Sequence, residues 1–266
     1  MKKDEKKGML HIVFSDKGGV GKTEVAQNVI APMLFKRGGK VVTVIEADDN
    51  NVSNTLVKSK VLKVESLKVS CGIKKAFEEL FEIYKGSEVC IDVGGGNDAY
   101  EFWDAFKGLG LDDECTFYIP VLKNKKGMRN LVNSVKAIRE YSSSKIVIVL
   151  NQVRTDNFND LKSEFNYFFG DKSRGIKGVL EVELGDVKNI TFAPIHDTSV
   201  FDYAEDYELT AFEIGTSKLD VKSFRENEAR KGFEEGMKAL AFISVYNDCK
   251  KYYEKTLKPF FKECEL

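Results

Sequence analysis

The chain has 266 residues, a formal net charge of −1, 42% hydrophobic residues and 31% charged residues. These values are typical of a globular protein, and the length favours one sizeable α/β domain over two small ones. The near-neutral charge excludes a global attraction to DNA or anionic lipid, so any such contact needs a local patch.

Two further features bear on the cellular compartment. Five cysteines are scattered without a CxxC pair, which predicts reduced thiols and a cytoplasmic location rather than a disulfide framework or a zinc site. Residues 1–8 form a charged tail of mixed sign, and the apolar run behind it is too short for a signal peptide. No run of 18 apolar residues occurs, so we expect no transmembrane segment.

Short apolar, β-branched runs alternate with longer helical patterns along the chain. The runs, which we predict to be buried strands, are Leu10–Phe14, Val41–Ile45, Val89–Val93, Thr116–Val121, Ile146–Leu150 and Ile190–Ile195. The predicted helices are Lys22–Phe35, with Pro32 expected to bend or shorten it, then Lys74–Tyr84, Ala99–Lys107, Met128–Tyr141 and Phe158–Phe169. This order predicts a three-layer, doubly wound α/β fold with a mostly parallel sheet, in a single domain over 1–266.

A glycine-rich segment, SDKGGVGKT from Ser15 to Thr23, lies between the first predicted strand and the first predicted helix. Its glycines allow the backbone to curl so that successive amide groups point at phosphate oxygens. The start of the helix adds its positive end to the same place. We therefore predict that the nucleotide is held by Gly18, Gly19, Val20, Gly21, Lys22, Thr23 and Glu24.

Lys22 and Thr23 give this loop its chemistry. The lysine supplies a charge for the β- and γ-phosphates, and the threonine supplies a hydroxyl ligand for Mg²⁺. Asp16 stands where the ordinary P-loop pattern requires glycine, so the strict pattern fails. A plain glycine-rich turn is the alternative, but it does not explain the Lys-Thr pair in a strand–turn–helix context.

The KGGVGKT segment with its additional lysine, Lys17, resembles the signature of the ParA/MinD family of deviant Walker A ATPases. The resemblance implies an ATPase that sandwiches two ATP molecules in a homodimer. Lys17 would then reach the partner's phosphates, so that hydrolysis depends on dimerisation. A solvent-facing loop charge is the alternative for Lys17.

The resemblance continues after the second and third predicted strands. Asp48 matches the second acidic position of the family's switch I and would orient the attacking water, although Glu46 replaces the usual first aspartate. Asp92 ends the third strand in the Walker B manner and would hold Mg²⁺, with Thr23 as the other metal ligand. Residues 94–96 are three glycines that resemble the switch II of the plasmid-stability and conjugation branch. An acidic loop and a plain glycine turn are the corresponding alternatives.

Two later positions complete the resemblance, which spans roughly residues 10–204. Asn151 would read the adenine edge with its amide, and Pro194 belongs to a segment that closes over the base. A strand-end cap and an ordinary turn residue are the alternatives.

The C-terminal segment, 218–266, is helix-prone and has eleven basic and seven acidic residues between Lys218 and Lys262. Phe233, Met237 and Leu240 recur at helical spacing, which predicts a terminal helix packed on the sheet with solvated charges. The acidic end after Lys262 is a poor match for a membrane-targeting helix, so we do not expect membrane-surface contact.

The resemblance implies a ParA-like ATPase of plasmid or DNA segregation that uses ATP and Mg²⁺. Its partners would be a second copy, a DNA-binding adaptor protein and nonspecific DNA, and it would be nucleoid-associated. The alternative is a nucleotide-switched accessory or scaffold protein for conjugation or intracellular positioning. A metabolic relative that couples ATP to reductive or ligase chemistry ranks last, because iron–sulfur reductases of this superfamily need cluster cysteines and no cysteine lies in the glycine loop 94–96.

Overall fold

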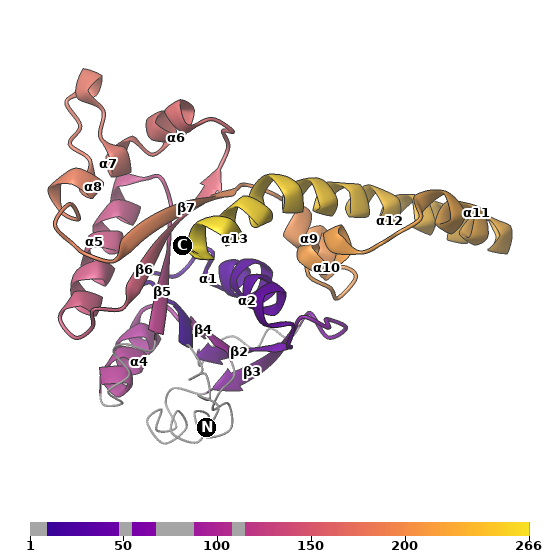
Figure 1. The fold of residues 1–266 in the computed structure, drawn as a ribbon, viewed down its shortest axis with the longest axis horizontal. Coiled ribbons are helices and arrows are strands. Elements are labelled where there is room, and N and C mark those ends of the chain that lie inside the picture. The colour runs from indigo at the N-terminus through magenta and orange to yellow at the C-terminus, as the bar shows by residue number, and fades with distance from the viewer. Residues whose placement is uncertain (1–9, 48–54, 68–87, 108–114, 266) are drawn as a thin grey trace, which may run out of the picture.

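The computed structural model describes residues 10–47, 55–67, 88–107 and 115–265. Its centre is a seven-stranded sheet in the order β3-β2-β4-β1-β5-β6-β7, in which every strand pair is parallel. The strands are β1 Leu10–Val13, β2 Val42–Ala47, β3 Leu62–Leu67, β4 Val89–Val93, β5 Cys115–Val121, β6 Lys145–Val153 and β7 Ile190–His196. The predicted three-layer α/β fold is confirmed (Figure 1).

The strand order places β1 between β4 and β5. Strands β2, β3 and β4 lie on one side of β1, and β5, β6 and β7 lie on the other side. Ligands of open α/β sheets bind at the carboxyl edge next to such a reversal of strand order. The glycine-rich segment Ser15–Thr23, from here on called the phosphate loop, leaves β1 at this edge. All six predicted strands are present, within a few residues at their ends.

Strand β3, at the edge of the sheet, is missing from the sequence prediction. Leu62 is its only buried residue, and the five residues after it are half-buried or exposed. Such a strand does not look like the continuous apolar runs of the interior strands, because one side of an edge strand meets solvent.

Helices cover both faces of the sheet. They are α1 Lys22–Val25, α2 Ala31–Gly38, α4 Asn97–Lys107, α5 Lys125–Arg139, α6 Phe158–Glu164, α7 Asn166–Phe169, α8 Val179–Val182, α9 Val200–Glu205, α10 Ala211–Thr216, α11 Val221–Lys231, α12 Phe233–Tyr252 and α13 Lys258–Glu265. The predicted helix over 74–84 lies outside the described residues. The predicted helix Phe158–Phe169 is divided at Phe165, which has non-helical backbone angles.

The first helical region neither ends nor shortens at Pro32. It runs from Lys22 to Gly38, with a π-helical turn over Ala26–Ile30 joining α1 to α2. Pro32 falls at the start of α2, directly after this wider turn. A proline ring inside a regular helix clashes with the carbonyl four residues earlier, and a wider turn relieves that clash.

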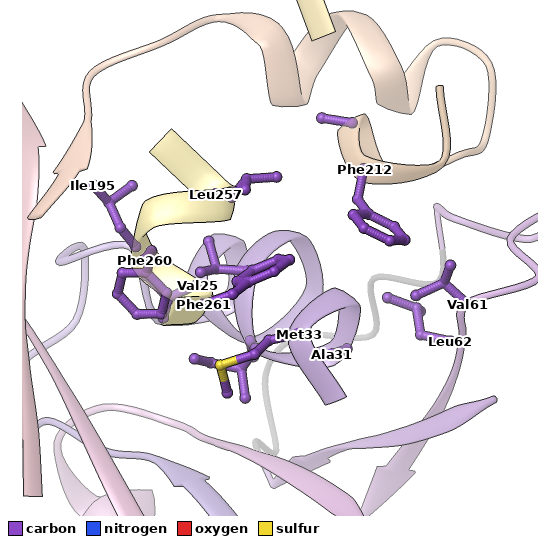
Figure 2. Packing of buried hydrophobic residues seen from close by; sticks show 14 of the residues in the cluster. Val25, Ala31, Met33, Val61, Leu62, Ile195, Phe212, Leu257, Phe260 and Phe261 are labelled. Atoms are coloured by element: carbon purple, nitrogen blue, oxygen red, sulfur yellow. The ribbon is translucent and has the colours of Figure 1, made fainter. Parts of the chain in front are cut away.

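Two hydrophobic clusters lie on opposite faces of the sheet. One includes residues of α4, α5 and α7, and the other joins α1 and α2 to the C-terminal helices. Figure 2 shows Leu257, Phe260 and Phe261 at the end of the chain gathered against Val25 and Met33. The predicted packing of the C-terminal segment on the sheet layer is therefore confirmed for its last turns.

The same prediction is wrong for the first half of that segment. Helices α11 and α12 form an antiparallel hairpin, the arm, which projects from the body of the molecule (Figure 1). Phe233 is 86% exposed, and Met237 and Leu240 are also exposed. Their helical spacing marks one face of α12, but within the described chain that face has no hydrophobic cover.

None of the described helices combines the length and the apolar character needed to cross a membrane. The described cysteines, Cys90, Cys115, Cys249 and Cys264, are free thiols.

A buried histidine lies near the amino-terminal end of β1. His11 is 1% exposed, and its Nδ1 lies 3.0 Å from the Tyr118 hydroxyl. Arg37 donates to His11 Nε2 at 3.2 Å, so the neutral ring keeps its proton on Nδ1. Burial, and secondarily the charge of Arg37, lowers the pKa of His11 to about 3.

This pKa predicts acid sensitivity of the fold. An unfolded histidine takes up a proton near pH 6.5, whereas folded His11 stays neutral until about pH 3. Stability therefore falls as the pH decreases through that window, by about 2 kcal/mol between pH 7.5 and pH 5. Urea unfolding at the two pH values measures the difference, and His11→Gln should reduce it by about the same amount. An equal pH dependence in both proteins would contradict the assignment.

Candidate nucleotide-binding site

The phosphate loop has the curled backbone that the sequence predicts. Gly19 and Gly21 have φ angles of +72° and +87°, in the left-handed region that favours glycine. Gly21 also caps the start of α1, so the amide groups of the loop lead directly into a helix N-terminus. Lys22 donates from Nζ to the Lys17 carbonyl at 3.1 Å, which holds its ammonium group against the loop.

The two predicted metal ligands meet below this loop. Thr23, in the first turn of α1, donates its hydroxyl to Asp92 Oδ2 at 2.7 Å. Asp92 is 6% exposed and ends β4, so a buried carboxylate faces a hydroxyl at the carboxyl edge of the sheet. Hydroxyl and carboxylate oxygens are the donors that Mg²⁺ prefers, and the pair fits that ion. Bound there with a nucleotide, Mg²⁺ would neutralise phosphate charge.

The glycine loop after β4 lies against the phosphate loop. Gly94 donates to the Ala47 carbonyl at 2.8 Å, and Gly96 donates to the Asp16 carbonyl at 3.2 Å. A Cβ on Gly95 would lie 2.8 Å from the Gly18 nitrogen, closer than the backbone tolerates. Close approach thus explains Gly95, where the loop has no room for a side chain, and the left-handed φ of +66° favours glycine at position 96.

Switch I is described only up to Ala47, so Asp48 lies outside the described residues. Glu46 is 3% exposed and accepts a hydrogen bond from Gln27 Nε2 at 2.9 Å. In the parallel register of β2 and β4 it is the partner of Asp92. Glu46 therefore links the end of β2 to the helical region after the phosphate loop. Its side chain is one methylene longer than that of the usual aspartate, which allows this contact.

Asn151 contacts the phosphate loop directly. Its Nδ2 donates to the Val20 carbonyl at 3.0 Å, and its Oδ1 accepts from the Gln152 amide at 2.9 Å. Gln152 has a φ of +59°, at an irregularity of the β6–β7 ladder. Such left-handed backbone at a non-glycine residue is rare and concentrates at functional sites. These contacts support the loop; the predicted recognition of adenine by Asn151 stays a prediction.

A cavity of about 690 Å³ lies over these residues. Of the predicted site residues, those that line it are Gly18, Gly19, Gly21, Lys22, Thr23, Glu24, Asp92 and Asn151. Lys17, Val20 and Pro194 are not in its wall. Pro194 lies within β7, paired with Leu150 of β6, so its expected closure over the base stays a prediction.

Sequence reasoning missed the part of the wall formed by the ends of β6 and β7 and by the residues after β7: Gln152, His196, Asp197, Thr198, Phe201 and Asp202. These residues are brought to the site only by the position of β7 in the sheet. The available signal was their place directly after predicted strands, at the edge where ligands of α/β sheets bind.

His196 connects this wall to the C-terminal segment. Its Nδ1 lies 3.0 Å from the Thr256 hydroxyl, and Tyr252 donates to its carbonyl at 3.2 Å. Burial, and secondarily the charge of Lys255, lowers the pKa of His196, so the ring is neutral near pH 7. Phe201, also in the wall, packs edge-on against Tyr252 with ring centroids 5.2 Å apart. The base of the arm is thus in contact with the lining of the cavity.

These features define a nucleotide-binding P-loop site, and a family comparison agrees. The family model described as "CobQ/CobB/MinD/ParA nucleotide binding domain" matches residues 11–177, which is more than half of the chain. The chain belongs to this family. No curated protein matches the sequence.

Solved structures resemble this chain at low sequence identity. The apo McdA structure from Cyanothece is 14% identical, with a TM-score of 0.50, covering 87% of this chain and 99% of that one. The MinD cell division protein of Aquifex aeolicus is 15% identical, with a TM-score of 0.49, covering 92% and 98%. MinD of Pyrococcus horikoshii, solved with Mg-ADP, is 13% identical, with a TM-score of 0.47, covering 91% and 95%.

The contact of Gly95 with Gly18 yields a prediction for nucleotide binding. Gly95→Ala should push the glycine loop away from the phosphate loop and lower nucleotide affinity by about tenfold or more, as expected for a steric conflict of 1–3 kcal/mol. Titration with a fluorescent adenine nucleotide measures it. Gly38→Ala is the control, because a Cβ there meets nothing within 4 Å. Equal affinities of the two variants would contradict the close approach.

Proposed function

We propose that this protein is a Mg²⁺-dependent ATPase of the ParA/MinD type that dimerises on ATP and acts in plasmid or DNA segregation. The observation that carries the proposal is the 2.7 Å hydrogen bond between Thr23 and Asp92 beneath the curled phosphate loop. A buried carboxylate and a hydroxyl at this position are what Mg²⁺-nucleotide chemistry requires. Family membership supports nucleotide binding.

Each predicted catalytic and metal-ligating residue has a role in this proposal. Lys22 neutralises the β- and γ-phosphates, and Thr23 and Asp92 hold Mg²⁺, the aspartate through water. Asp48 orients the attacking water, and Lys17 reaches the phosphates bound by the partner copy. Since phosphoryl transfer depends on alignment and charge stabilisation, loss of any of these affects turnover more than folding. A DNA-binding adaptor protein would stimulate the reaction on a dimer bound to nonspecific DNA, at the nucleoid.

The roles of Lys17 and Asp48 are separable by experiment. With ATP and Mg²⁺, Asp48→Ala should accumulate a dimer with turnover reduced by about a hundredfold or more. Lys17→Ala should stay monomeric by light scattering and should not turn over ATP. Lys40→Ala, an exposed lysine before β2, is the control. If both variants behaved like the control, with and without DNA, the sandwich dimer would be disproved.

The role of Asp92 predicts a specific metal dependence. Asp92→Asn keeps the shape of the side chain but removes the charge that holds the ion. We expect the Mg²⁺ concentration for half-maximal ATP turnover to rise by about tenfold or more. Binding of ATP in EDTA should change much less. A variant with unchanged Mg²⁺ dependence would show that the ion is held elsewhere.

One observation favours a second candidate, a nucleotide-switched accessory or scaffold protein. Tyr252, at the base of the arm, contacts both His196 and Phe201 of the cavity wall. A π-helical turn over Tyr253–Leu257 follows it, and such turns often occur at functional sites. Nucleotide in the cavity could therefore bias the arm, with partner binding as the output and turnover incidental.

The two candidates differ in hydrogen exchange. The switch predicts that amides of Tyr252–Leu257 and of α12 exchange differently when a non-hydrolysable ATP analogue replaces ADP. The comparison should be made on Lys17→Ala, which by the first proposal stays monomeric, so that dimerisation does not mask the effect. Identical exchange of the arm in both nucleotide states would rule out the switch.

A further inference from the structure

A second concave surface lies away from the nucleotide site, between α5 and the segment that carries α7 and α8. This α5 groove has a volume of about 430 Å³ and is lined from α5, from Tyr167 of α7, from Lys177 and from the start and end of α8. The helix α5 leaves the carboxyl end of β5, so the first turn of α5 and the phosphate loop lie at the same edge of the sheet. The groove has no part in the ATPase chemistry proposed above.

The floor of the α5 groove is apolar. Met128 and Val132, on successive turns of α5, line it but are themselves buried, and Tyr167 and Val179 line it as well. Tyr167 and Val179 are half-buried, so they offer contact area that the chain itself does not fill. Apolar side chains do not bind the charged backbone of a nucleic acid. They do pack against apolar side chains, such as the leucines of a protein segment.

The rim of the groove is basic. Lys125, Arg129 and Lys136 lie along the exposed side of α5, and Lys177 lies opposite. Glu183, the single acidic side chain in the lining, pairs with Lys136 at 3.0 Å. The other three cations have no carboxylate partner within the described part of the chain. The groove therefore carries an excess of positive charge on both walls.

The first turn of α5 adds to this field. It begins with Lys125 and Lys126 and contains no acidic residue, although a helix N-terminus favours negative side chains. Asn124 caps the turn by accepting from the Gly127 amide at 2.7 Å. The cap satisfies a backbone donor but does not compensate the positive charge of the two lysines. An anionic ligand at this end is therefore stabilised by the lysines and the helix dipole together.

We propose that the α5 groove binds an acidic amphipathic helix of a partner protein. The apolar side of that helix contacts Tyr167 and Val179, which are half-buried, and its carboxylates meet the unpaired cations of both walls. This combination of an apolar anchor with flanking charge is how grooves recognise amphipathic helices. The charges set specificity and association rate, and the floor supplies desolvated contact. The proposal does not depend on ATP hydrolysis.

The test uses a fluorescein-labelled synthetic peptide about five helical turns long, with leucines at helical spacing and glutamates flanking them. Fluorescence anisotropy on the full chain without nucleotide should give a dissociation constant of about 10–100 μM. A scrambled peptide of the same composition should bind about tenfold or more weakly, because it has no apolar face. Equal binding of the two peptides, or no binding of the patterned one, would overturn the proposal.

Variants locate the binding. The double variant Arg129→Glu with Lys177→Glu, both at exposed positions, should raise the dissociation constant of the patterned peptide by about a hundredfold. The matched control is Lys222→Glu with Arg225→Glu on α11, which makes the same change of charge on the arm. Val179→Asn should weaken binding through the floor, and circular dichroism checks that each variant is folded. An equal effect of groove and control variants would overturn the assignment.

A nucleic-acid ligand is the competing outcome. A short duplex DNA should bind weakly in this assay and should not displace the patterned peptide. If the duplex displaced it, and if Val179→Asn left both ligands unaffected, the groove would be a phosphate-binding surface and the proposal would be wrong. Failure of the ATPase proposal would appear as absent turnover and would not alter these peptide results.

Discussion

The hydrogen bond between Thr23 and Asp92 is the contact on which the rest of the nucleotide site depends. It joins the first turn of α1 to the end of β4, two elements that are far apart in the chain. Because Asp92 is buried at the carboxyl edge of a parallel sheet, its carboxylate is held at fixed distance from the phosphate loop. The loop before Thr23 and the glycine loop after Asp92 are positioned around this pair.

The unusual residues of both loops follow from that geometry. Gly95 approaches the backbone of Gly18 so closely that no side chain fits, and Gly96 bonds to the carbonyl of Asp16. Glycine at position 95 is therefore a packing requirement, and the φ of +66° favours glycine at position 96. Glu46, which departs from the family pattern, contacts Gln27 behind the phosphate loop, so its carboxylate serves the link between β2 and the first helical region.

The apolar residues of the C-terminal segment have two different environments. Leu257, Phe260 and Phe261 complete the core on one face of the sheet, while Phe233 is exposed at the tip of the arm. Between them, Tyr252 contacts the residues that follow β7 in the cavity wall. The arm therefore contacts the cavity wall at its base, and Phe233 at its other end is exposed.

The sequence by itself determined the parallel α/β fold, the phosphate loop and the Thr23–Asp92 pair, because these depend on local patterns: buried strand runs, glycines that permit a curl, and a carboxylate at a strand end. Only the tertiary structure decided which residues after β6 and β7 complete the cavity and that β3 forms the edge. It also decided that the apolar face of α12 has no cover within the described chain. Helical spacing specifies which side chains share a face, but what covers that face is set by contacts between distant segments.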